Sequence, residues 1–201
     1  MSKINLFLFA APRSGSTQLA KWLASNRDIG CTLVKEPNFF SECDFPSEYV
    51  EKENLNDVNP SKLKNFKKYS SRSIQFSIFR NELDYERLVS WIDEKYKMDA
   101  STSYLNSQFA LNKILQYNSD AKFIVLLRNP LERMVSHYRL ALRTGRENFT
   151  FRERIQKECL VDEPPHQKYL IRYSKYFDSV KNLLEKVNIN NVHFVYFEDM
   201  I

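Results

Sequence analysis

Short apolar runs alternate along this chain with segments in which apolar residues recur every three or four positions. Apolar or alternating runs of four to eight residues are typical of strands, and helical spacing is typical of amphipathic helices. The pattern predicts strands at residues 4–9, 31–34, 73–79, 122–128 and 192–197. It predicts helices at residues 18–25, 85–96, 107–117 and 166–187, and another that begins at Pro130.

Strands that alternate with helices indicate parallel βαβ units. We therefore predict one α/β domain over residues 1–201, a three-layer α/β/α fold with a central parallel sheet. Residues 99–104 are predicted to form a short strand or a loop. The helix that begins at Pro130 is predicted to direct four side chains inward, those of Leu131, Met134, Val135 and Tyr138.

Residues 41–73 are polar and irregular, which predicts a surface insertion. This segment carries a cluster of lysines, Lys62, Lys64, Lys67 and Lys68. Such a cluster usually forms a solvated face, and the alternative is a patch for an acidic ligand.

The composition indicates a soluble globular protein, with 43% hydrophobic and 27% charged residues. No apolar run approaches the roughly 18 residues of a membrane span. The first residues lack the features of a secretory signal, and three scattered cysteines fit a reducing compartment. We therefore expect a cytoplasmic protein without a membrane span, and its net charge of +5 indicates only a mild preference for anionic partners.

Residues 10–17, Ala-Ala-Pro-Arg-Ser-Gly-Ser-Thr, take the place of a phosphate-binding loop between the first strand and the first helix. In the pattern G-x-x-x-x-G-K-[ST], Gly15 and Thr17 fit, whereas alanine replaces the first glycine and Ser16 replaces the lysine. A glycine, three hydroxyls and a helix N-terminus are features of an anion site, and Arg13 adds positive charge. The alternative is an ordinary helix-capping turn.

A second basic motif follows the clearest strand of the chain. Arg128 stands at the carboxyl end of that strand, where ligands bind in open α/β sheets. Ser136 lies eight residues later, about two helical turns along. The guanidinium and the hydroxyl together can hold a second phosphate, although either residue alone indicates only a helix end or a surface position.

The two motifs together resemble those of the sulfotransferase superfamily, which uses 3′-phosphoadenosine 5′-phosphosulfate (PAPS). They are Arg13-Ser-Gly-Ser-Thr and, about 110 residues later, Leu127-Arg-Asn-Pro-x-Glu-Arg-x-x-Ser-x-Tyr. The resemblance implies a fold like that of P-loop nucleotide kinases. It also implies in-line transfer of a sulfuryl group from PAPS to an acceptor hydroxyl or amine, with PAP as product and no metal.

The resemblance also implies residue roles. Arg13, where many members have lysine, would neutralise charge on the oxygen of the departing PAP. Arg128 and Ser136 would hold the 3′-phosphate. The implied cofactor-binding set is Arg13, Ser14, Gly15, Ser16, Thr17, Gln18, Arg128, Ser136 and Tyr173. For Tyr173 the alternative is helix packing.

A third segment, Glu36-Pro-Asn-Phe-Phe, resembles the Glu-x-x-Phe-Phe stretch of glycan-type sulfotransferases such as the heparan sulfate enzymes. In those enzymes the glutamate is the catalytic base, so the resemblance implies this role for Glu36 and a carbohydrate as one acceptor class. Without the cofactor motifs, Glu36 would be interpreted as a solvated carboxylate.

The chain departs from the family pattern in two places. Residues 99–104 resemble the Glu-Lys-Thr-Pro-x-Tyr segment of the heparan sulfate group, but Ala100 replaces its functional lysine. Any role of that lysine must be absent or supplied from elsewhere, with Lys35 as the candidate. The chain also ends at Ile201, so the family's C-terminal segment that closes over the cofactor is expected to be missing.

Two other functions stay open. One is a small-molecule kinase built on a P-loop, and the other is a non-catalytic sulfotransferase-like module that binds a nucleotide or a glycan.

No pair of histidines has metal-ligand spacing, and His137 is expected to pack or lie at the surface. The sequence has no basic stripe with interleaved aromatic residues, so it gives no indication of nucleic-acid binding. The expected partner is a small-molecule or glycan acceptor. An anionic glycan could be attracted by the arginines at positions 139, 143, 146, 152 and 154.

Overall fold

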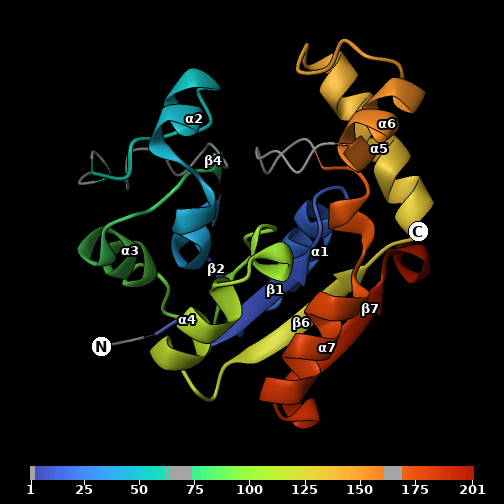
Figure 1. Cartoon of the computed structure of the whole chain (residues 1–201). Helices are drawn as coiled ribbons and strands as arrows, with labels where there is room; N and C mark the ends of the chain where they lie inside the picture. The colour runs from blue at the N-terminus through green and yellow to red at the C-terminus, as the bar shows by residue number, and fades with distance from the viewer. Residues whose placement is uncertain (1–2, 62, 64–73, 161–168) are drawn as a thin grey trace.

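The computed structural model describes residues 3–61, 63, 74–160 and 169–201. Within them, five parallel strands form a central sheet in the order β2-β5-β1-β6-β7 (Figure 1). The strands are β2 (Ile29–Cys31), β5 (Tyr96–Asp99), β1 (Leu6–Ala10), β6 (Lys122–Leu127) and β7 (Val192–Tyr196). None of the helices in this part of the chain is long and apolar enough to cross a membrane.

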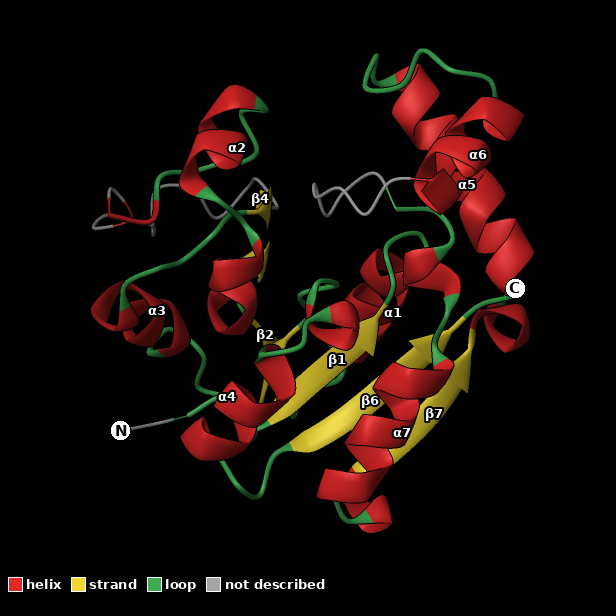
Figure 2. Cartoon of the chain, viewed as in Figure 1, coloured by secondary structure: helices red, strands yellow, loops and turns green. Residues whose placement is uncertain are grey.

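The three layers arise because the central strand, β1, packs against helices on both of its faces. Successive side chains of a strand point to opposite faces, and β1 is apolar on both. Leu6 and Leu8 pack with Leu19 of α1 (Ser16–Leu23). Phe7 and Phe9 pack in a second cluster with residues of α3 (Glu82–Val89), α4 (Ala110–Tyr117) and α7 (Phe177–Lys186). Figure 2 shows α4 and α7 in front of the sheet and α1 behind it. The predicted α/β/α fold is confirmed.

The predicted strand over residues 31–34 is wrong in its bounds. The chain forms β2, which ends at Cys31, and a separate strand β3 (Val34–Glu36). β3 pairs in parallel with β4 (Ile74–Phe76), so Glu36 lies opposite Phe76 in a small second sheet. This pairing carries Glu36 away from the central sheet.

Helix boundaries differ from the sequence pattern in three regions. α3 ends at Val89, before β5, instead of running to residue 96. α6 (Phe151–Leu160) has no buried residue, so no apolar stripe could predict it. The helix expected over 166–187 is observed as a short 3₁₀ turn at Arg172–Ser174 followed by α7, and its predicted start lies outside the described residues.

The segment 41–73 is more ordered than its composition predicts. Its described part contains α2 (Ser47–Lys52), and Phe45, Val50 and Leu55 are buried in a cluster with Ile78. The predicted lysine cluster lies outside the described residues. Its role as an insertion stays a prediction, but its apolar residues attach it to the domain.

The helix α5 (Pro130–Arg143) begins at an Asn129 cap whose side chain accepts hydrogen bonds from the amides of residues 131 and 132. Its predicted inward face is wrong at Leu131, which is 66% exposed. The buried residues of this helix are Arg133 and His137.

Arg133 is completely buried and is satisfied by oxygen atoms from distant parts of the chain. Its guanidinium donates to the carbonyl of Pro12 at 2.9 Å, to the carbonyl of Leu170 at 2.6 Å and to the hydroxyl of Ser174 at 2.6 Å. Burial lowers the pKa of Arg133 to about 10. The group therefore stays charged at neutral pH and joins the first loop, α5 and the segment before α7.

Replacing Arg133 tests whether this residue holds the first loop, α5 and the segment before α7 together. Arg133→Met removes the donors of Arg133. It leaves the Pro12 carbonyl without this donor and takes one hydrogen bond each from the Leu170 carbonyl and the Ser174 hydroxyl, which stay bonded to each other. We expect the free energy of unfolding to fall by about 3 kcal/mol in urea titrations. Arg139→Met, an exposed position on the same helix, is the control and should change it by less than about 0.5 kcal/mol. Equal effects of the two substitutions would contradict the assignment.

Candidate functional site

The loop between β1 and α1 is shaped by two residues in the left-handed region. Arg13 has φ 72° and Gly15, the N-cap of α1, has φ 91°. Gly15 has a second constraint, because a Cβ built there would lie 2.5 Å from the ring of Phe197. The sequence indicated that this glycine is one feature of an anion site, and the structure adds that it makes room for the side chain of Phe197, which follows β7.

Arg13 and Arg128 face a common depression, which we call the basic cleft. It is lined by residues of the first loop and of α5, including Arg13, Arg128, Ser136, Arg139 and Arg143. Arg13 Nε donates to Ser136 Oγ at 3.3 Å, and Arg128 Nη1 donates to the Arg13 carbonyl at 3.0 Å. The two motifs that lie far apart in sequence therefore meet.

The basic cleft concentrates positive charge. Burial, with Arg143 and Arg128 nearby, lowers the pKa of the Arg13 guanidinium below its usual value. Arg128 packs over the Phe197 ring at 4.2 Å, and its Nε is buried without a hydrogen-bond partner among the described residues. The largely exposed carboxylate of Glu132 lies 3.6 Å from Arg128 Nη2. Guanidinium groups in this arrangement favour a phosphate.

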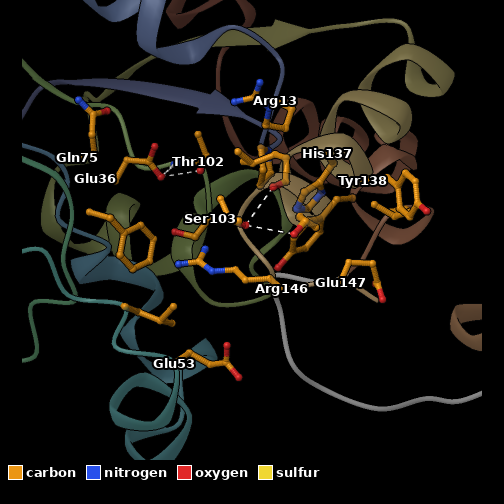
Figure 3. Close-up of a pocket in the computed structure, with 18 of the residues that line it drawn as sticks. Arg13, Glu36, Glu53, Gln75, Thr102, Ser103, His137, Tyr138, Arg146 and Glu147 are labelled. Atoms are coloured by element: carbon orange, nitrogen blue, oxygen red, sulfur yellow. Dashed lines mark hydrogen bonds between the residues drawn. The ribbon is translucent and has the colours of Figure 1, made fainter. Parts of the chain in front are cut away.

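A second depression of about 460 Å³, which we call the aromatic cavity, also has Arg13 in its lining (Figure 3). Its lining includes Glu36, Thr102, Ser16 and Thr17. Arg13 lines both depressions.

Glu36 is held in this cavity by two partners. Its Oε1 accepts from Lys35 Nζ at 2.7 Å, and its Oε2 accepts from Thr102 Oγ1 at 2.6 Å. Lys35 is only 7% exposed and also donates to Ser16 Oγ at 2.9 Å. The ammonium group of Lys35 therefore reaches the loop position at which nucleotide hydrolases carry their lysine.

Asp99 anchors the loop that carries Thr102. This buried carboxylate accepts from Tyr85 and Tyr104 at 2.9 and 2.8 Å and from the Ser101 hydroxyl at 2.7 Å. Ser101 in turn accepts from the amide of Asn38 at 2.9 Å, two residues beyond Glu36. The network connects the loop after β5 to the segment after β3. Ala100 is completely buried in the cluster beneath α1.

Other predicted cofactor residues take different places. Ser14 is completely buried, with its hydroxyl near that of Tyr176. Gln18 is exposed on the first turn of α1, and its amide donates to the Gly15 carbonyl at 3.0 Å. Neither residue lines the basic cleft or the aromatic cavity as defined here. Their roles stay predictions.

Tyr173 lies in the wall of the aromatic cavity, apart from the residues that line the basic cleft. Its ring is parallel to that of His137 at 6.5 Å between centroids, and burial raises its pKa well above the usual value. His137 is buried, as the packing interpretation expects, and its Nδ1 lies 3.2 Å from Arg133 Nη1. Contact of Tyr173 with a cofactor stays a prediction.

Sequence reasoning missed Thr102 and Arg133. Thr102 belongs to the segment that was compared with the heparan sulfate group, and Arg133 lies inside the motif around Arg128. Their spacing within those motifs was the available signal.

Comparison with known proteins agrees with these features. A family model described as "Sulfotransferase family" matches residues 5–201. A comparison with curated proteins finds no match.

The solved structures that resemble this chain include sulfotransferases. The chain is similar to a sulfotransferase from Alicyclobacillus acidocaldarius, with 26% identity, a TM-score of 0.80, and coverage of 100% of this chain and 75% of that one. It is also similar in fold to a sulfotransferase domain from the curacin biosynthetic pathway. That match has 19% identity, a TM-score of 0.61, and coverage of 99% and 69%.

The Asp99 anchor predicts a pH effect on stability. Burial raises the pKa of Asp99 from 3.8 to about 6, against the opposing hydrogen bonds. The folded state therefore binds this proton more tightly than the unfolded state. Its stabilising contribution, on the order of 1–3 kcal/mol, is present below about pH 4 and is lost as the pH rises through about 6.

Asp99→Asn removes this titration. We expect the difference in unfolding free energy, wild type minus variant, to decrease between pH 4 and pH 7 in urea titrations at several pH values. A difference that is constant over this range would show that Asp99 does not titrate as described.

Proposed function

Because the chain belongs to the sulfotransferase family, we propose that this enzyme moves a sulfuryl group from PAPS to a hydroxyl or amine of an acceptor. The observation that carries the proposal is the position of Arg13, which lines both the basic cleft and the aromatic cavity. A group bound at Arg13 would thus face the basic residues on one side and Glu36 on the other.

The residues present fit the proposed cofactor. The unpartnered Nε of Arg128 and the crowded guanidinium groups beside Ser136 favour a doubly charged anion, which is the 3′-phosphate in this proposal. The start of α1, with the amides of its first turn, would take the 5′-phosphosulfate. When bound, PAPS supplies a sulfuryl group on a good leaving group.

The chain's own residues would supply the remaining chemistry. Glu36, oriented by Thr102, would take the proton of the acceptor hydroxyl. Arg13 and Lys35 would place positive charge near Ser16, where negative charge develops during transfer. Lys35 would thereby supply the charge of the lysine that Ala100 replaces.

One observation also favours a second function. Since Lys35 Nζ lies 2.9 Å from Ser16 Oγ, an ammonium group stands near the position of a P-loop lysine, as a small-molecule kinase requires. Two calorimetric titrations, one with PAP and one with ATP plus magnesium, distinguish the sulfotransferase from the kinase. Tighter binding of PAP is expected, and tighter binding of ATP would favour the kinase. PAP binding without sulfate transfer to any acceptor would favour the non-catalytic module.

Arg128 is predicted to recognise the 3′-phosphate. Arg128→Met should weaken PAP binding by about 10- to 100-fold and leave binding of adenosine 5′-monophosphate nearly unchanged, because only PAP carries the 3′-phosphate. Calorimetry with both nucleotides measures this. Arg152→Met, exposed on α6, is the control. A parallel loss for both nucleotides would place Arg128 elsewhere in the site.

Glu36 is predicted to act on the acceptor and not on the cofactor. Glu36→Gln should keep PAP affinity within about twofold and lower sulfate transfer by roughly 100-fold or more. Glu42→Gln is the matched control, because Glu42 pairs with Lys113 at 2.9 Å and lines neither depression. Transfer of labelled sulfate from PAPS is the measurement, and full activity of Glu36→Gln would eliminate it as the base.

A further inference from the structure

The aromatic cavity beyond Glu36 has two apolar walls. One wall comes from the segment around α2 and from β4, with Phe45, Tyr49 and Phe76. The opposite wall comes from α5 and from the segment before α7, with Tyr138 and Tyr173 (Figure 3). Aromatic and aliphatic walls around a few polar groups are the usual lining of a site for a small organic molecule.

Most of the charged groups in this cavity are already engaged inside the protein. Asp57 accepts from the amides of Gln75 and Phe76 at 3.0 and 2.8 Å. Glu147 accepts from two backbone amides and lies 3.7 Å from Arg154. Glu36 is paired with Lys35. These groups hold the walls together and offer little charge to a ligand.

Among the described residues, the lining of the cavity has no excess of positive charge. Its lining contains three arginines and four carboxylates, namely Arg13, Arg146, Arg154, Glu36, Glu53, Asp57 and Glu147. Of the five arginines that the sequence suggested for an anionic glycan, only Arg146 and Arg154 line this cavity. Arg139 and Arg143 line the basic cleft, Arg152 is exposed on α6, and Arg154 faces Glu147. Arg146 also lines the cavity, and Glu53, of opposite charge, is in the same lining.

We propose that the acceptor is an uncharged phenol or alcohol with an apolar ring body, bound between these two walls with its hydroxyl at Glu36. The proposal rests on the function given above. In transfer, the acceptor oxygen forms a bond to sulfur while the bond from sulfur to the phosphate oxygen breaks. Its electron pair leaves with PAP, and the acceptor proton goes to Glu36. A polyanionic glycan would meet a lining of balanced charge and would lose hydration against aromatic rings.

The test uses 2-naphthol as the probe and measures its binding by fluorescence in the presence of saturating PAP. Ala141→Trp fills the cavity from α5 without removing a core side chain, and Tyr49→Ala removes part of the opposite wall. We expect naphthol binding to weaken at least 10-fold in Ala141→Trp, with PAP affinity within twofold. Leu142→Trp, the neighbouring and 44% exposed position, is the matched control.

The outcomes separate this inference from the proposed function. Naphthol binding that both cavity variants weaken, with sulfation of naphthol, supports the proposal. Binding or sulfation of an uncharged phenol that neither variant changes overturns it. Sulfation of a heparosan tetrasaccharide but not of naphthol also overturns it and leaves the sulfotransferase function standing. Naphthol binding lost in Ala141→Trp, in a protein that does not bind PAP, supports the cavity assignment and overturns the proposed function.

Discussion

The geometry of the site depends on one buried positive charge, the guanidinium of Arg133. Three acceptors from two separate parts of the chain surround it, at Pro12 and at Leu170 and Ser174. Removing a guanidinium from water is costly, and good hydrogen-bond geometry must offset that cost. Such a group fixes its partners relative to one another. Here the partners are the first loop, the helix that carries Ser136 and the wall that carries Tyr173.

The parallel sheets bring chemically different groups to one edge. Arg13 follows β1, Thr102 follows β5 and Arg128 follows β6, so all three come from the carboxyl ends of central strands. Glu36 arrives at the end of β3, in the small second sheet. Because loops at this edge are free to vary while the strands stay fixed, the residues of the basic cleft and those of the aromatic cavity can be placed independently. The division into a basic cleft and an aromatic cavity follows from this arrangement.

Sequence predicted the parts of the molecule that local pattern controls. β1, β6 and β7 are apolar runs, and α5 begins at an Asn-Pro signal, so these elements were found within one or two residues. The positions of Arg13 and Arg128 at one edge of the sheet also follow from the sequence, because the carboxyl ends of parallel strands share an edge. Their direct contacts with each other and with Ser136 were not predicted. The separation of β2 from β3 was not predicted either, because it depends on the pairing of β3 with β4, about 40 residues away. The spacing of the motif around Arg128 could have marked Arg133 as a candidate residue. It could not have predicted the burial of Arg133, because the acceptors of its hydrogen bonds are distant in sequence.

The contact between Gly15 and Phe197 has a consequence for how the protein is made. The ring of Phe197 occupies the space beside Gly15 and packs against Arg128, so residues that follow the first and last strands of the sheet touch one another. Phe197 is synthesised long after Gly15 and Arg128. The first loop and Arg128 can therefore make these contacts only once β7 has been synthesised and has paired with β6.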